Sequence, residues 1–185
     1  MLKFALLGFL NYTPLTGYEL ENWINVSTGN FWHAKLSQIY TTLKTLEEDG
    51  LLISHVKAQE GRPDKRVYTI TDSGRADLQE WLASPILESE VKKDGLLLKL
   101  FFSYPTGKEA IVMQLRLQLD LHRRQLARYR NDAVEAMKQA IEQVPAVEKD
   151  TFMWEMVRRY GEMYEAMYIH WLEQTIEEVQ KHFSD

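Results

Sequence analysis

The spacing of the apolar residues changes once along this chain, and that change limits the folds open to it. Over most of the sequence the apolar residues recur every three or four positions, which is the period of an amphipathic helix. Between residues 51 and 71, two short runs rich in β-branched and aromatic residues, LLISHV and RVYTIT, instead flank the polar segment KAQEGRPDK. We therefore expect one β-hairpin in an otherwise helical chain.

Three short helices are predicted before the hairpin. The first covers residues 2–10, and the second opens after Thr16, which stands three positions before Glu19 in the spacing of a capping box. The third covers residues 36–49 and ends at Gly50, because glycine readily takes the left-handed conformation that ends many helices.

A fourth helix is predicted directly after the hairpin, over residues 72–83, with Thr71 or Asp72 as its N-cap. The resulting order of helix, helix, helix, strand, strand, helix is typical of a winged helix. The segment ASPILESEVKKDG then interrupts the helical period, and no strand signal follows it. We expect a winged-helix domain over residues 1–84, a hinge over residues 85–95 and a helical domain over residues 96–185.

The motifs around the hairpin resemble those of a known family. SQIYTTLKTLEEDGLL, followed by GRPDKRVYTITDSGRADLQEWL, resembles the DNA-binding domain of PadR-type transcriptional regulators. LLLKLFF, at residues 96–102, resembles the start of their C-terminal helical domain, and HWLEQTIEEV is similar to their last helix. The resemblance implies a mainly α fold, in which a winged helix-turn-helix domain with a two-stranded wing precedes a dimerisation domain of long antiparallel helices.

The same resemblance implies a function. It implies a sequence-specific DNA-binding transcriptional regulator, a repressor, that binds a pseudo-palindromic double-stranded DNA operator as a homodimer. It also implies release from the operator by a small aromatic effector. The alternative interpretation of the residues is a winged-helix protein-protein interaction module that does not bind DNA.

The third predicted helix has one apolar and one polar side, because Leu36, Ile39, Leu43 and Leu46 follow one another at spacings of three and four. The opposite side can meet base edges in the major groove, where an amide such as Gln38 pairs with adenine. The acidic residues 47–49 would repel phosphate, so we expect only the first two turns to face DNA. A solvated helix surface is the alternative. The predicted DNA contacts on this helix are Lys35, Ser37, Gln38, Tyr40, Thr41 and Lys44.

The polar segment between the two predicted strands is basic in a chain whose formal net charge is -5. Affinity for the phosphate backbone rests on clustered lysine and arginine, so any DNA contact of this chain must be local. Half of the basic residues within residues 1–90 lie in residues 57–66. We expect this wing to contact DNA, and a solubilising loop is the alternative. Its predicted contacts are Lys57, Arg62, Lys65 and Arg66.

The second half of the chain carries apolar residues at heptad spacing in two long helices, joined by the segment QVPAVEKD. Two long helices joined by a short turn pack antiparallel, and seams of this length favour a homodimer. A purely intramolecular bundle is the alternative. The first seam contains Leu115, Leu119, His122, Leu126 and Tyr129 and continues to Ala140. The second seam contains Met153, Val157, Tyr160, Tyr164, Met167 and Trp171.

The last helix is rich in aromatic residues and methionine, which suit an adaptable ligand lining. The family resemblance implies an aromatic effector here, although core and dimer interface would use the same residue types. His122 is either a buried pH switch or a hydrogen-bonded interface histidine. The predicted effector contacts are Trp154, Tyr160, Tyr164, Tyr168 and Trp171.

No catalytic, cofactor or metal site is predicted. The chain has no cysteine, which excludes disulfides, thiolate nucleophiles and zinc sites built on sulfur. The sequence contains no His-Glu-x-x-His pattern, no glycine-rich phosphate loop and no nucleophile-elbow serine. No apolar run approaches eighteen residues, and no leader pattern is present. We therefore expect a cytoplasmic, non-enzymatic protein without a membrane partner.

Overall fold

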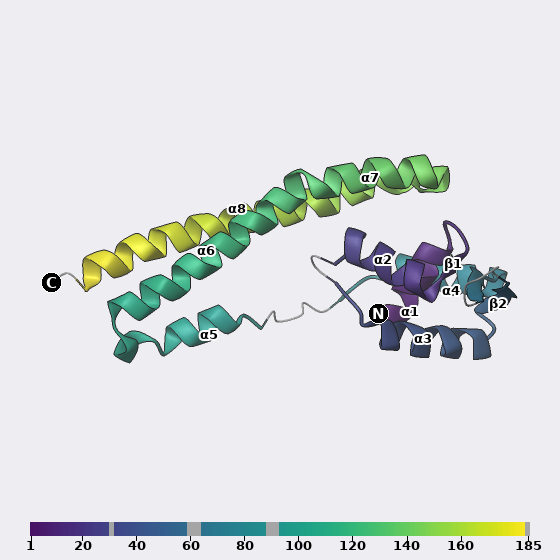
Figure 1. Cartoon of the computed structure of the whole chain (residues 1–185), viewed down its shortest axis with the longest axis horizontal. Coiled ribbons are helices and arrows are strands. Elements are labelled where there is room, and N and C mark those ends of the chain that lie inside the picture. The colour runs from purple at the N-terminus through teal and green to yellow at the C-terminus, as the bar shows by residue number, and fades with distance from the viewer. Residues whose placement is uncertain (30–31, 59–63, 88–92, 184–185) are drawn as a thin grey trace. The chain divides into compact units, whose positions relative to one another are not determined.

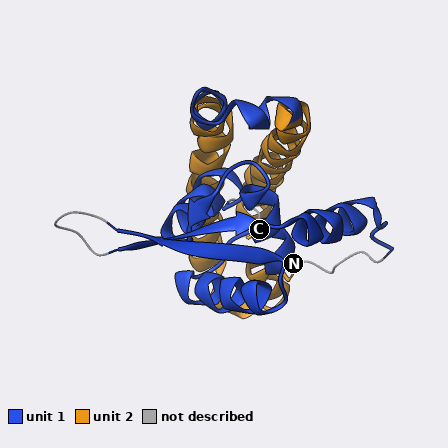
Figure 2. Ribbon diagram, turned by 90° about the vertical axis from the view of Figure 1, so that its right-hand side faces the viewer, with its two compact units in different colours: residues 1–87, 136–149 blue, residues 88–135, 150–185 orange. Residues whose placement is uncertain are grey.

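The structure is a computed structural model that describes residues 1–29, 32–58, 64–87 and 93–183 (Figure 1). It separates into two compact units, coloured in Figure 2. One unit contains Met1–Leu87 and Ala136–Lys149, and the other contains Glu88–Glu135 and Asp150–Asp185. Within the described ranges, no helix combines the length and the apolar character that a membrane crossing requires.

The first unit contains the four helices expected around the hairpin, with their caps. At the start of α2, Thr16 Oγ1 accepts a hydrogen bond from the Glu19 amide (3.2 Å), and Glu19 Oε2 accepts one from the Thr16 amide (2.8 Å), which confirms the capping box. Gly50 has a φ of 72° after α3, and the Thr71 hydroxyl accepts from the Gly74 amide at the start of α4 (3.1 Å). The helices are α1 (Leu2–Leu10), α2 (Gly17–Ser27), α3 (Leu36–Glu48) and α4 (Asp72–Ala83).

The predicted hairpin is present, but the sheet has a third strand that sequence analysis did not include. β2 (Leu52–Lys57) pairs antiparallel with β3 (Lys65–Ile70), and the two-residue β1 (Leu15–Thr16) pairs with the other edge of β3. The strand order is β1-β3-β2. A strand of two residues is too short to show the alternation of apolar and polar residues by which strands are predicted. Its pairing depends on where the α1–α2 connection meets β3.

The core of this unit lies between the apolar sides of the four helices and one side of the sheet. Ile39, Leu43 and Leu46 of α3 are buried, as their spacing predicts. They pack in one cluster with apolar residues of α1 and α2 and with Leu52 and Tyr68 of the hairpin. Because the buried side of α3 contacts this cluster, its opposite side faces outward.

The second unit is built on a long antiparallel helix pair, as predicted. The pairing residues run in opposite directions along α6 and α8 (Figure 1): Tyr129 meets Gly161, and His122 meets Glu165. Leu115, Leu119 and Leu172 belong to the shared apolar cluster. The helices after residue 93 are α5 (Gly95–Phe101), the short η1 (Tyr104–Thr106), α6 (Lys108–Arg130), α7 (Asp132–Gln143), the short η2 (Pro145–Asp150) and α8 (Thr151–His182), and residues 136–149 of α7 and η2 belong to the first unit.

One expectation for this half was wrong. The heptad seam was predicted to continue in a single helix to Ala140, whereas α6 ends at Arg130 and α7 begins at Asp132. Next to this break the Arg158 guanidinium donates a hydrogen bond to the Tyr129 carbonyl (3.1 Å), giving a polar partner to a carbonyl at the end of α6. Because Arg158 is on α8, spacing within the first helix could not show the break.

Candidate nucleic-acid interface

The predicted contact residues of α3 lie on one exposed side of that helix. Ser37, Gln38, Tyr40, Thr41 and Lys44 are all exposed. The Thr41 hydroxyl donates to the Ser37 carbonyl (2.9 Å), so its oxygen remains an acceptor that faces outward. Short polar side chains above a buried apolar side allow the backbone of α3 to approach another surface closely.

The start of α3 uses Gln38 in a second role. Lys35 occupies the N-cap position, and an ammonium side chain has no acceptor to offer the helix. Instead, Gln38 Oε1 accepts a hydrogen bond from the Lys35 amide (3.1 Å). A two-point contact between Gln38 and adenine needs both the oxygen and the NH2 group of the amide. Such a contact would therefore have to replace or share the bond to Lys35.

Tyr40 is held against the beginning of α2. A Cβ atom added to Gly17 would lie 2.6 Å from the Tyr40 ring, so only glycine permits this approach. The ring is nevertheless 46% exposed. Gly17 therefore helps to set the position of Tyr40, a role that sequence analysis missed because nothing local to Gly17 identifies the partner.

The wing residues divide into two groups. Lys57 and Lys65 are directly opposite one another at the end of the β2–β3 ladder, and both are exposed. Because the two positive charges are adjacent, together they attract an anion more strongly than either lysine would alone. Arg62 lies outside the described residues, so the structure does not place it. Arg66, the fourth predicted wing contact, is engaged differently.

Arg66 joins the wing to the last turns of α3. Its Nη2 atom is 2.8 Å from Glu47 Oε2, and its Nε atom donates to Ser54 Oγ (2.7 Å). Ser54 in turn donates to Glu47 Oε1 (2.6 Å). The hydrogen bond from Ser54, and then the charge of Arg66, lowers the pKa of Glu47. We call Arg66, Glu47 and Ser54 the wing clasp. It neutralises one of the acidic residues expected to repel phosphate.

Lys44 has a weaker partner. Its ammonium is 3.7 Å from Glu48 one turn along α3, and both side chains are largely exposed. An exposed pair of this kind holds its members only loosely, so Lys44 can turn toward another anion.

Comparison with known proteins relates each half of the chain to a family model. Residues 6–80 match the model of the transcriptional regulator PadR-like family, and residues 92–180 match the model described as virulence activator alpha C-term. The chain is also similar to a crystal structure of Bacillus subtilis PadR in complex with operator DNA, with a TM-score of 0.80 and 28% identity over 96% of this chain and 98% of that chain. The first half of the chain therefore resembles the PadR-like family of transcriptional regulators.

Two curated relatives are also similar to this chain. The negative transcriptional regulator PadR of B. subtilis (strain 168) is 38% identical over 102 residues, which cover 55% of this chain and 56% of that protein. The probable transcriptional regulator Rv1176c of Mycobacterium tuberculosis is 44% identical over 85 residues, covering 46% and 45%. The match thus spans about half the length of these relatives. The Vibrio cholerae virulence activator AphA has the same fold over 98% of this chain, with a TM-score of 0.69 and 26% identity.

The predicted dimer residues fall into buried and exposed sets. On α6, Leu115, Leu119 and Tyr129 are buried, His122 and Leu126 are partly buried, and the seam faces the chain's own α8. This part of the pattern serves packing within the chain. On α8, Tyr164 and Trp171 are partly buried. Met153, Val157, Tyr160 and Met167 are 44% to 69% exposed.

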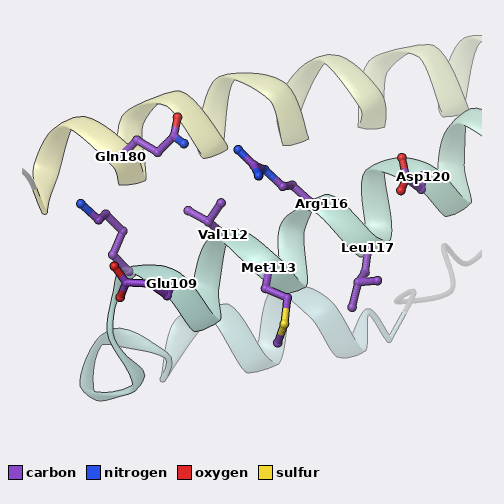
Figure 3. Close-up of a pocket in the computed structure, with 8 residues that line it drawn as sticks. Glu109, Val112, Met113, Arg116, Leu117, Asp120 and Gln180 are labelled. Atoms are coloured by element: carbon purple, nitrogen blue, oxygen red, sulfur yellow. The ribbon is translucent and has the colours of Figure 1, made fainter.

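A second exposed apolar surface lies on α6, beside a groove of about 640 Å³ (Figure 3). Val112 points toward α8, whereas Met113 and Leu117 point away from it. Met113 is 61% exposed and Leu117 is 55% exposed. These positions are offset from the predicted seam, so sequence analysis did not include them.

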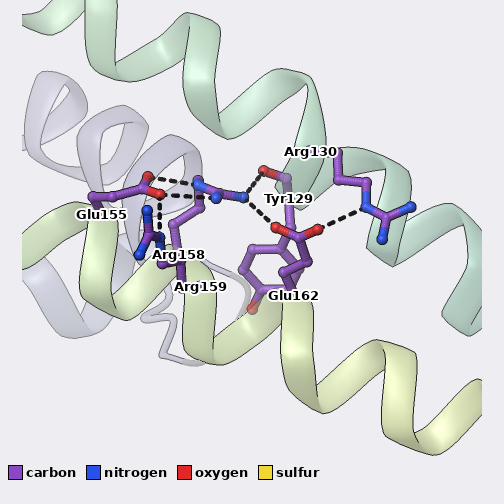
Figure 4. A network of polar contacts seen from close by, with 6 residues as sticks. All are labelled: Tyr129, Arg130, Glu155, Arg158, Arg159 and Glu162. Atoms are coloured by element: carbon purple, nitrogen blue, oxygen red, sulfur yellow. Dashed lines mark hydrogen bonds and ion pairs between the residues drawn. The ribbon is translucent and has the colours of Figure 1, made fainter.

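A network of ion pairs joins the end of α6 to the first turns of α8 (Figure 4). Arg158 bonds to Glu155 (2.7 and 2.9 Å) and to Glu162 (2.9 Å), and Glu162 also pairs with Arg130 of α6 (2.8 Å). Hydrogen bonds, first from Arg158 and then from Arg159, lower the pKa of Glu155 to about 2. This network joins α8 to α6 beside the break in the first seam.

The predicted effector residues are only partly brought together. Tyr164 and Tyr168 have ring centroids 5.8 Å apart and line a pocket of about 440 Å³. Trp171 contacts Tyr168 (5.2 Å) without lining the pocket, and Tyr160 is 69% exposed. Trp154 is partly buried and is not in the pocket wall either. The other polar groups of the wall come from the segment before α5, from α5 and α6, and from Glu165 of α8, and none of them was predicted as an effector contact.

Proposed function

We propose that this chain is a sequence-specific DNA-binding transcriptional regulator, a repressor, that binds a pseudo-palindromic operator as a homodimer. The observation that carries the proposal is the outward side of α3, whose first two turns expose the polar side chains of Ser37, Gln38 and Thr41 and carry no acidic residue. The B. subtilis structure that resembles the whole chain contains operator DNA, which supports the same function.

In this proposal α3 enters the major groove while the wing follows the phosphate backbone. Ser37, Gln38 and Thr41 face the base edges, and Tyr40 and Lys44 reach toward the flanking phosphates. Lys35 lies at the entry to the groove. Lys57 and Lys65, together with Arg62, hold the backbone. Arg66 acts indirectly, by keeping the wing in register with α3.

The exposed apolar surfaces support dimerisation through the helical half. Met113 and Leu117 of α6 and Met153, Val157 and Met167 of α8 expose apolar area that a second copy would cover. An interface with two-fold symmetry presents two copies of α3 at a separation of roughly 34 to 36 Å, one turn of DNA. The proposed parts are the winged-helix domain over residues 1–84, the hinge over residues 85–95 and the dimerisation domain over residues 96–185.

We further propose that a small aromatic effector releases the regulator from its operator and that the protein acts in the cytoplasm. A B. subtilis PadR structure similar to 97% of this chain, at 28% identity and a TM-score of 0.77, contains p-coumaric acid. An effector of this kind acts by binding one arrangement of the dimer more tightly than another, so that the DNA-competent arrangement becomes less populated.

The test is fluorescence anisotropy with DNA from upstream of the protein's own gene and an unrelated duplex as control, from about 50 to 200 mM salt. We expect preferential, salt-dependent binding of one dimer per duplex. If no preference appears, selection from a random DNA pool follows. Failure to select any sequence would refute DNA recognition in favour of the protein-interaction module.

A further inference from the structure

The start of α2 is tied to the strand that carries the wing. Thr16 is the last residue of β1 and the N-cap of α2, so no loop separates the strand from the helix. β1 pairs with β3, with Leu15 opposite Tyr68 and Thr16 opposite Val67, and β3 begins in the wing at Lys65. The first residue of α2 is therefore held at a fixed place beside β3.

That first residue, Gly17, is buried and has no room for a side chain. A Cβ atom added to it would lie 2.6 Å from Cε1, 2.8 Å from Cζ and 3.2 Å from Cδ1 of Tyr40 on α3. Gly17 does not have a positive φ, so its backbone conformation is open to other residues. The Tyr40 ring, and not the backbone, therefore requires glycine at this position.

Tyr40 lies between the buried and the outward sides of α3. One edge of its ring meets Gly17, yet the residue is 46% exposed. Thr41 follows it directly, and Ser37 lies about one turn before it. A rotation of α3 that moves the Tyr40 ring therefore also moves the outward side chains of Ser37 and Thr41.

Tyr40 is also close to the base of the wing. Burial raises the pKa of Tyr68 on β3, and the charge of Arg66 opposes that rise. The nearby groups of Glu47 and Tyr40 raise the pKa of Tyr68 further. The Arg66 guanidinium carbon is 5.8 Å from the centroid of the Tyr68 ring. The start of α2, the middle of α3 and the base of the wing therefore meet around Tyr40.

We propose that Gly17 is a positioning residue for operator binding: by admitting the Tyr40 ring, it fixes the rotation of α3 relative to α2 and the wing. A residue with a Cβ would have to push the ring from 2.6 Å to an ordinary contact distance of at least 3.4 Å. Hydrogen bonds to base edges depend on distance and direction, whereas attraction to the phosphate charges acts over a longer range. Replacing Gly17 should therefore reduce the preference for the operator more than the affinity for DNA in general. The inference deepens the proposed function and rests on it.

The test compares Gly17→Ala with Gly8→Ala, because Gly8 of α1 has open space around it. Anisotropy titrations measure the affinity of each variant for the duplex that the wild type prefers and for an unrelated duplex. Gly17→Ala should bind the preferred duplex at least about tenfold more weakly, the loss expected when one base contact is misplaced. Its affinity for the unrelated duplex, and both affinities of Gly8→Ala, should stay within about twofold of the wild type. Unchanged affinity of Gly17→Ala for the preferred duplex, or an equal loss on both duplexes, would overturn the proposal.

A double-mutant cycle shows whether Gly17 acts through the Tyr40 ring. Tyr40→Ser removes the ring, so adding Gly17→Ala to Tyr40→Ser should change operator affinity by less than about twofold. The same cycle is measured in melting temperature, which needs no DNA. Gly17→Ala should lower the melting temperature of the wild type and should not lower that of Tyr40→Ser. If Gly17→Ala has the same effect in both backgrounds, Gly17 does not act through Tyr40 and the proposal is wrong.

Two substitutions of Tyr40 test the proposal if Gly17→Ala does not fold. Tyr40→Phe keeps the ring, so the ratio of affinities for the preferred and the unrelated duplex should stay within about twofold of the wild type. Tyr40→Leu removes the ring edge that meets Gly17 and should lower that ratio about tenfold. Equal ratios for the two variants would contradict the proposal. A wild type that prefers no sequence refutes the proposed function, whereas the melting-temperature cycle still decides whether Gly17 and Tyr40 act as a pair.

Discussion

Removing the wing clasp without changing the net charge should weaken operator binding equally at every salt concentration. The change is the double substitution Glu47→Gln with Arg66→Gln, which deletes the 2.8 Å ion pair and disturbs the bonds to Ser54. If Arg66 positions the wing and does not itself neutralise a phosphate, no counterion release is lost with it. The slope of log affinity against log salt should then stay that of the wild type.

The size of the effect follows from the exposure of the pair. The Arg66 side chain is 55% exposed and that of Glu47 is 28% exposed, so screening reduces the pair to the upper end of the surface range, about 1 kcal/mol. That free energy corresponds to about a fivefold change in the ratio of correctly placed to displaced wings, so affinity falls by up to about fivefold for each protomer.

Lys65→Gln is the matched comparison. It removes a charge at the end of the ladder, and each lost phosphate contact lowers the salt slope by about 0.9, or about 1.8 for a dimer. Between about 50 and 200 mM salt this amounts to roughly a tenfold change in the ratio of the affinities of variant and wild type. Anisotropy titrations at four salt concentrations resolve the two patterns. A drop in slope for the clasp variant equal to that of Lys65→Gln would show that Arg66 contacts phosphate.

Three further predictions concern single positions. Gly161→Ala should destabilise the protein by about 1–3 kcal/mol, because the new Cβ overlaps the Tyr129 ring. Gly8→Ala, with open space around it, should stabilise the protein by about 0.5–1 kcal/mol. Thermal unfolding of both variants measures the contrast, and equal effects would contradict the packing argument. Glu155 has a pKa of about 2 in the folded chain and about 4.5 in the unfolded chain, so it stabilises the fold above pH 4.5 and loses this contribution as pH falls toward 2. The difference in melting temperature between wild type and Glu155→Gln should therefore shrink from about pH 4.5 to about pH 2. A constant difference would refute the assignment. Gln38→Glu keeps an acceptor for the Lys35 amide but removes the NH2 donor and adds a negative charge. The melting temperature should therefore equal that of the wild type, while the preference for the operator sequence is lost. Retained preference would exclude Gln38 from base recognition.

Features that depend on a few neighbouring residues were predictable from the sequence. The capping box of Thr16 and Glu19, the left-handed Gly50 and the hairpin are each encoded within a short segment, where local hydrogen bonds and backbone preferences decide the outcome. The outward side of α3 was predictable for the same reason, since the buried side repeats with the helical period.

The partners of long side chains were not predictable. Arg66 was interpreted as a DNA contact because it lies in a basic segment, but its position beside Glu47 depends on how the hairpin packs against α3. Likewise, the seam residues of α6 were predicted as dimer contacts, and the structure shows that α8 of the same chain buries Leu115 and Leu119. A heptad pattern reports that one side is covered and does not identify what covers it.

By itself the sequence therefore determined the first four helices, the hairpin, the caps at Thr16, Gly50 and Thr71, and the polar side of α3, because each rests on interactions within a few residues along the chain. Only the tertiary structure decided that Arg66 closes a clasp, that Arg158 meets the end of α6, and that the Tyr40 ring meets Gly17. These relations join residues far apart in sequence, and they exist only where packing of the apolar cores brings separate helices and strands to the same place.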